Sequence, residues 1–211
     1  MDCIDSFARK LPFRPPSLPY SYSALNKISD TNGIESHFKN FHMRGFEDLM
    51  EYIATLNAEN TSLCQFFKNA DEYDSKIIEA ACIVYNHQLF WDNLSPYCGE
   101  LSYELDAAIN RTFGSTFKLK EKFIETGMKS GFSGWLWLIV NNKNHLQLIT
   151  TTNNENPVLK HALVKGSPIL TIDLWEHAYA QKFSNDKEAY LKSVWSIINW
   201  CEVSQRYRFS I

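Results

Sequence analysis

The stretch "LTIDLWEHAYAQKF", residues 170–183, places a carboxylate and an imidazole four positions apart, directly after an apolar, β-branched run. Asp173 closes the run and His177 follows it, with leucine, tryptophan and tyrosine side chains around them. A charge buried among such side chains is costly unless it is paired, because burial removes its hydration. A cation bound between the two side chains would explain how this pair can be buried.

The overall composition is that of a globular protein without a broad charged surface. The 211 residues are 45% hydrophobic and 21% charged, and the net charge is −3 with both signs interspersed. No run of eighteen or more apolar residues occurs, so we expect no membrane span. Without a basic field, any RNA contact would be local. Arg206 and Arg208 could touch RNA phosphates, although a solvated helix end is the favoured interpretation of these two residues.

The cysteines and the N-terminal residues bear on the cellular compartment. The five cysteines are odd in number, scattered and without a C-x-x-C pair, which argues against a disulfide framework and a zinc finger and favours a reducing interior. The first sixteen residues, "MDCIDSFARKLPFRPP", lack the apolar core of a signal peptide. We expect an extension or a trimmed transit remnant, and an intracellular location with mitochondria favoured over cytoplasm.

The first half of the chain is predicted to be helical. Apolar residues at helical spacing predict a helix over residues 29–58, with Gly45 as a possible kink. Residues 74–94 are apolar nearly all round, which is typical of a buried helix. Two amphipathic helices are expected within residues 101–114 and 115–132, with a glycine near the end of each.

The pattern then changes to that of a small sheet. Residues 134–152, "GWLWLIVNNKNHLQLITTT", predict two strands joined by a polar turn, and "SPILTI" (167–172) predicts a third. One long apolar-striped helix is expected over residues 186–209. Helices, then a small sheet, then helices favour an α+β fold in two parts, with the boundary between Leu94 and Tyr103.

The histidines divide into two groups by their surroundings. His145 and His161 lie in polar turns and are interpreted as solvated. Three others lie in apolar or aromatic segments, where a charged imidazole would be penalised: His37, His87 and His177. Taken one at a time, each of these is interpreted as a hydrogen-bonded core histidine. Together with Asp173 they would offer three nitrogens and one oxygen, a donor set that suits iron or manganese.

Six segments of the chain are similar, in order, to motifs of one known protein family. "DLWEHAY" (173–179) is similar to the family signature D-x-W-E-H-A-Y, and "VYNHQLFWDNLSP" (84–96) is similar to the helix that carries its second histidine ligand. Four further segments resemble family motifs in the same order: "SLPYSYSAL" (17–25), "FGSTFKLKEKF" (113–123), "SGWLWL" (133–138) and "YLKSVWSIINW" (190–200). The family that these segments resemble is the iron/manganese superoxide dismutases. The likeness runs from about Ser17 to Arg206, nearly the whole chain.

The resemblance implies an α+β fold in which an N-terminal helical hairpin packs on a C-terminal α/β domain with a small three-stranded antiparallel sheet. The expected parts are an extension (1–16), the hairpin domain (17–96) and the α/β domain (97–211). The implied ligands of one iron or manganese ion per chain are His37, His87, Asp173 and His177. The resemblance also implies a pocket walled by Trp91, Trp137 and Trp175.

The chain departs from the family pattern around this implied site. The glutamine of the iron type is replaced by Ile83, and the segment that supplies it in the manganese type offers Asn154, a weaker donor to metal-bound solvent. The tyrosine expected eight residues after the first ligand aligns with Gly45. At the implied dimer interface, a histidine and a tyrosine that normally pair are replaced together by Phe41 and Ala180. Because both change, neither polar side chain is left without its partner. The resemblance further implies that Glu176 reaches across the dimer to the partner's ligand histidine.

Three functions remain open from the sequence. The first is a superoxide dismutase with an unusual outer shell, acting on superoxide as a homodimer or as a heterodimer with a related chain. The second is a non-catalytic subunit of a large assembly that includes ribosomal RNA, such as the small subunit of the mitochondrial ribosome. The third is a redox sensor that uses Cys82, although a buried cysteine in an apolar helix is usually inert.

Overall fold

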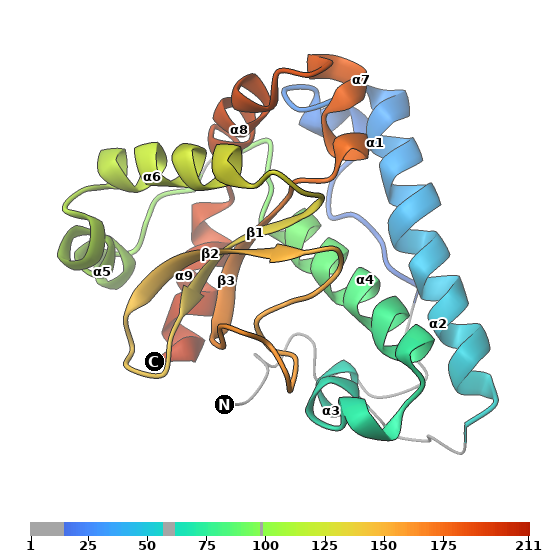
Figure 1. The fold of residues 1–211 in the computed structure, drawn as a ribbon. Coiled ribbons are helices and arrows are strands. Elements are labelled where there is room, and N and C mark those ends of the chain that lie inside the picture. The colour runs from blue at the N-terminus through green and yellow to red at the C-terminus, as the bar shows by residue number, and fades with distance from the viewer. Residues whose placement is uncertain (1–14, 57–61, 98) are drawn as a thin grey trace.

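The N-terminal part of the molecule is a helical hairpin. The structure, a computed structural model, describes residues 15–56, 62–97 and 99–211 (Figure 1). The first arm runs through α1 (Thr31–His37), a π-helix (Phe38–Met43) and α2 (Arg44–Ala54), and the second arm is α4 (Ser75–Asp92). Asp30 caps α1 by accepting the backbone N–H of Gly33, and α2 packs along α4. The predicted helical hairpin is therefore confirmed.

The first arm changes helix type just before Gly45. The change of helix type falls in the π-helix, where the N–H of Arg44 donates to the carbonyl of Lys39, five residues earlier. Gly45 lies two residues beyond the π-helix, and a kink there stays a prediction. Gly45 is needed for close packing, because a Cβ atom there would lie 2.4 Å from Cγ2 of Ile83 on α4.

A short helix that the sequence pattern did not predict, α3 (Leu63–Lys68), precedes α4. It starts with a capping box, in which Ser62 and Gln65 each accept the other's backbone N–H. A single turn of 3₁₀-helix (Ala70–Glu72) follows it, and another (Tyr22–Leu25) precedes α1.

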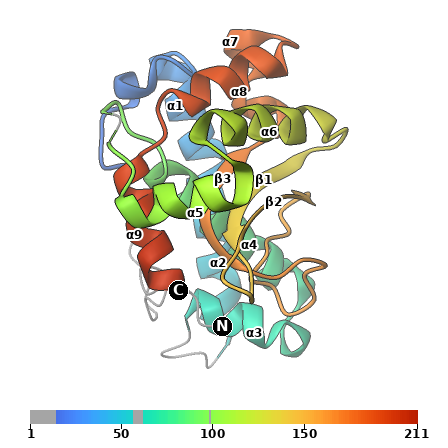
Figure 2. The same ribbon diagram turned by 90° about the vertical axis from the view of Figure 1, so that its left-hand side faces the viewer.

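The C-terminal part is an α/β domain built on a three-stranded antiparallel sheet. Helices α5 (Tyr103–Phe113) and α6 (Thr116–Lys129) precede three strands: β1 (Gly134–Val140), β2 (Leu146–Thr152) and β3 (Ser167–Asp173). The strand order is β2-β1-β3, and β1 is buried along its whole length. The polar turn between β1 and β2 is held by Asn141, whose side chain accepts two backbone N–H groups. Figures 1 and 2 show the sheet between the hairpin and the α5–α6 pair.

The end of the chain forms two helices rather than the single long one that was expected. After the short α7 (Ala180–Phe183), α8 (Lys187–Trp195) and α9 (Trp200–Ser210) are separated by residues 196–199. In this break Ile198 pairs with Leu94, and the N–H of Asn199 donates to the carbonyl of Asn93. The side chain of Asn199 then caps α9. The break ties the C-terminal helices to the end of α4.

Some charged and sulfur-containing side chains also differ from expectation. Arg206 is buried and pairs with Asp92 at 3.3 Å, so the local RNA contact and the solvated helix end are both wrong for this residue. Cys82 and Cys201 are free thiols, whereas Cys64 is disulfide-bonded. Among the helices of the described ranges, none is long and apolar enough to cross a membrane.

Candidate metal centre

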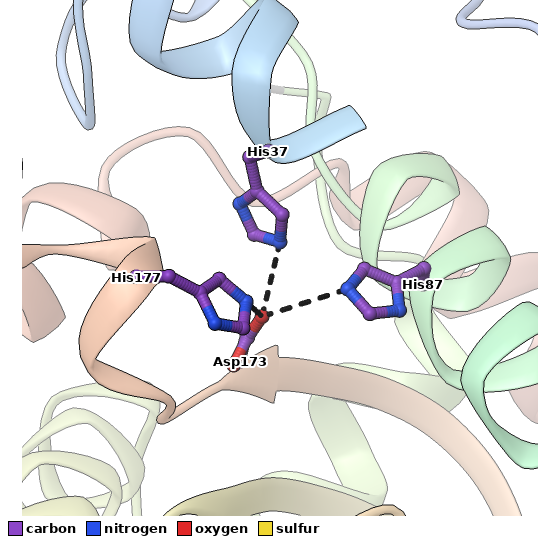
Figure 3. A group of neighbouring side chains, drawn as sticks. All are labelled: His37, His87, Asp173 and His177. Atoms are coloured by element: carbon purple, nitrogen blue, oxygen red, sulfur yellow. Dashed lines mark hydrogen bonds and ion pairs between the residues drawn. The ribbon is translucent and has the colours of Figure 1, made fainter. Parts of the chain in front are cut away.

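Four side chains from four separate elements converge on one point (Figure 3). His37 ends α1, His87 lies within α4, Asp173 ends β3, and His177 lies in the 3₁₀-helix Glu176–Ala178. One nitrogen or oxygen atom of each lies within 4.8 Å of the others. From Oδ2 of Asp173, the Nε2 atoms of His37 and His177 are each 3.1 Å away, and that of His87 is 3.9 Å away. The structure thus brings together the four residues that the resemblance implied as ligands.

The orientation of His87 is fixed by its own helix. Its Nδ1 lies 2.9 Å from the carbonyl oxygen of Ile83, one helical turn earlier. Since a carbonyl can only accept, Nδ1 must carry the proton, and Nε2 then presents its lone pair toward Asp173. A hydrogen bond of this kind from the outer nitrogen is usual for histidines that bind metals.

Asp173 is held as a carboxylate by its local turn. It is fully buried, and its Oδ1 accepts the backbone N–H of Trp175 at 2.8 Å, which leaves Oδ2 facing the imidazoles. Burial alone would raise the pKa of Asp173, but the neighbouring His177 and His37 outweigh it and lower that pKa below its ordinary value. The buried site therefore contains a negative charge.

Two imidazole nitrogens at the site face only the carboxylate of Asp173. Within the described part of the chain, the buried Nε2 of His87 makes no hydrogen bond, and the buried Nε2 of His37 has only its 3.1 Å contact with Oδ2 of Asp173. Burial lowers the pKa of both histidines, to about 3 for His87, so their lone pairs are free at neutral pH. Unpaired buried nitrogens are costly, and a cation bound to them would remove that cost. Three imidazoles and one carboxylate fit one iron or manganese ion.

Tryptophan rings border three of the four side chains. The ring centroid of Trp91 lies 4.8 Å from that of His37, and Trp175 stacks at 5.9 Å on His177. The third neighbour is Trp135, 5.0 Å from His87, a residue to which the sequence analysis gave no role. Trp137, which the resemblance implied, lies behind Trp135 at 6.2 Å and donates its N–H to Thr151. Both come from β1, where alternate residues share one face of the sheet.

His42 is a second residue that the sequence analysis missed. It is 1% exposed, its ring stacks at 5.8 Å on His87, and neither ring nitrogen has a hydrogen-bond partner among the described residues. Burial lowers the pKa of His42 well below the ordinary value, with His87 and His37 acting in the same direction. No periodic signal separates it from the neighbouring helical residues. In contrast, His145 and His161 are exposed, as their polar segments predicted.

The residues that replace family positions lie around this cluster. The side chain of Asn154 donates to Glu79 at 2.9 Å and accepts from Trp135 at 3.5 Å, so it is engaged outside the ligand cluster. Its role toward metal-bound solvent stays a prediction. Ile83 fills the space beside Gly45, where a tyrosine was expected.

The residues of the implied dimer interface lie on the side of His177. Glu176, in the same 3₁₀-helix as His177, is exposed, and Ala180 is the first residue of α7. Phe41 packs against the rings of His177 and His37. The interface roles of these residues stay predictions.

Comparisons with known proteins agree along almost the whole chain. Residues 12–95 match the family model described as iron/manganese superoxide dismutases, alpha-hairpin domain, and residues 101–206 match the model of the C-terminal domain. The chain is 34% identical to a superoxide dismutase [Mn] of Acinetobacter baylyi over 202 residues, which cover 94% of this chain and 89% of that protein. It is also 34% identical over 205 residues to a superoxide dismutase [Mn/Fe] 2 of Staphylococcus aureus, with 93% and 98% covered.

Proposed function

Because the chain belongs to the iron/manganese superoxide dismutase family, we propose that it converts superoxide to oxygen and hydrogen peroxide at one bound iron or manganese ion. The observation that carries the proposal is the complete donor set, in which the buried Nε2 atoms of His37 and His87 have no partner besides Asp173 in the described structure. The ion would supply the one-electron redox chemistry that these side chains lack.

The protein's own residues prepare the site for a cation. Burial keeps His37 and His87 neutral, so that protons do not compete for their lone pairs at neutral pH. The charge on Asp173 offsets part of the charge of the ion in a buried environment. Trp91 and Trp135 border the ligand rings and limit the access of water.

The delivery of the two protons needed for peroxide depends on the altered surroundings of the site. The family's glutamine and tyrosine positions hold Ile83, whose side chain has no hydrogen-bond donor, and Gly45, which has no side chain. Asn154, which would be the replacement donor, gives its amide to Glu79. We therefore infer that protons reach the site through solvent rather than from a side chain in direct contact with the ion.

The dimer partner and the cellular location of the protein are further parts of the proposal. The partly exposed His177 and the exposed Glu176 beside it support a dimer in which the glutamate contacts the partner's ligand histidine. The scattered cysteines without a C-x-x-C pair favour an intracellular location, and we propose mitochondria rather than cytoplasm.

Neither alternative function gains support. The matched relatives are superoxide dismutases, and Arg206, one of the two expected RNA contacts, is buried in an ion pair. Burial raises the pKa of the Cys82 thiol, which keeps it protonated and unreactive and weighs against the redox sensor.

The direct test is to measure bound metal and superoxide consumption on the same purified sample. We expect one iron or manganese ion per chain and consumption well above the background of the free metal. The variant His87→Gln should lose metal and activity together, whereas the exposed control His145→Gln should retain both. A fully loaded protein without superoxide consumption would refute the enzymatic function.

A further inference from the structure

Phe41 contacts two of the three imidazoles of the metal site. Its ring lies face to face with that of His177, with 3.6 Å between centroids and 10° between planes. The same ring meets His37 edge to face at 5.7 Å and 89°. Phe41 lies in the π-helix that follows His37, a type of helix that is rare and often marks functional sites. One apolar ring thus links the first helical arm to the 3₁₀-helix that carries His177.

His177 is the least restrained of the three imidazoles. Its side chain is 20% exposed, compared with 6% for His37 and 3% for His87. His87 is fixed by a hydrogen bond from Nδ1 to a backbone carbonyl, but Nδ1 of His177 has no such partner among the residues that the structure describes. The only hydrogen bond of the His177 ring there joins Nε2 to Asp173. Within one chain, its outer side is therefore held by ring contacts, and the glutamate contact proposed across the dimer would add to them.

The geometry of the stack favours an electron-poor imidazole ring. Two neutral aromatic rings prefer offset or edge-to-face arrangements with centroids 4.5–7 Å apart, because the faces of both are electron-rich. A closer face-to-face pair becomes favourable when one ring is electron-poor, as in a cation–π contact. Coordination through Nε2 would withdraw electron density from the ring of His177. Phe41 would then interact more strongly with the metal-bound form of this histidine than with the free form.

We propose that Phe41 is a positioning residue that holds the ring of His177 in the orientation that binds the metal and slows the release of the ion. It covers a face of the most exposed ligand, where water would otherwise compete for the ion. This inference rests on the metal site of the proposed function, but it does not require that the bound ion be catalytically active.

The test is the rate at which metal-loaded protein loses its ion to an excess of a chromogenic chelator. Phe41→Leu keeps an apolar side chain of similar size but has no aromatic face, and we expect metal release about tenfold faster. Phe41→Trp restores an aromatic face and should return the rate toward that of the parent. Phe46→Leu is the matched control, since Phe46 is a buried phenylalanine of the same helical arm with no ring contact to a ligand, and its rate should stay within about twofold.

Each outcome decides the proposal. An unchanged rate in Phe41→Leu, or equal acceleration in Phe46→Leu, would overturn it, because the effect would then be absent or due to packing alone. If Phe41→Leu is not folded by circular dichroism, Phe41→Met replaces it under the same criterion. The assay involves no superoxide, so slow release from an inactive protein would refute the enzymatic function and leave this inference standing. A parent protein that binds no iron or manganese would refute both.

Discussion

Replacing Gly45 by alanine should destabilise the protein only while Ile83 is present. The added Cβ would lie 2.4 Å from Cγ2 and 3.1 Å from Cβ of Ile83, and a β-branched side chain in a helix cannot rotate away easily. Overpacking of this kind costs about 1–3 kcal/mol. Alanine also gains about 1 kcal/mol over glycine within a helix. The expected net loss of unfolding free energy is therefore about 0–2 kcal/mol.

The variant Ile83→Ala removes the closest contact and should reverse the sign of the effect. In that background, Gly45→Ala should stabilise the protein by up to about 1 kcal/mol, since the helix propensity gain remains. The interaction energy of the double-mutant cycle should then be about 1–3 kcal/mol. Urea denaturation of the four proteins, prepared with the same metal content, measures it. If Gly45→Ala changes stability equally in both backgrounds, within about 0.3 kcal/mol, the close contact between the two helices does not exist.

Three further predictions address the site and the fold. The metal-free protein should lose stability as the pH falls from about 6.5 to about 3, because burial lowers the pKa of His87 in the folded state to about 3. The unfolding free energy should fall by up to about 1.4 kcal/mol per pH unit for this one group. An unfolding free energy that does not change with pH in denaturant titrations would contradict the burial of His87 as a neutral imidazole. Asn199→Ala should cost about 1 kcal/mol through loss of the α9 cap, measured by thermal unfolding, whereas Asn185→Ala, outside any cap, should not. Asp173→Asn should abolish metal retention after gel filtration while helix content is kept.

Local sequence patterns were enough to predict the elements that carry the ligands. Apolar residues at helical spacing predicted the arms that hold His37 and His87, and the apolar run ending at Asp173 predicted β3. The spacing of Asp173 and His177 across a strand end is also local, so both were found. The convergence of all four came from the resemblance to a family, because no single segment encodes a contact between distant parts of the chain.

The features that escaped prediction depend on contacts between distant segments. The break between α8 and α9 forms because residues 196–199 pair with Asn93 and Leu94, about a hundred positions earlier. The place of Trp135 beside His87 depends on how far β1 reaches toward α4, which residue alternation cannot specify. The need for a glycine at position 45 arises from Ile83 on the other arm.

In the proposed function, four side chains from separate elements bind a single iron or manganese ion. Anomalous X-ray scattering from crystals of the native protein, recorded on both sides of the iron and manganese absorption edges, would locate this ion. We expect one strong peak per chain, within bonding distance of the Nε2 atoms of His37, His87 and His177 and of Oδ2 of Asp173. A metal-replete crystal with no peak among these four atoms, or with its peak elsewhere, would contradict it.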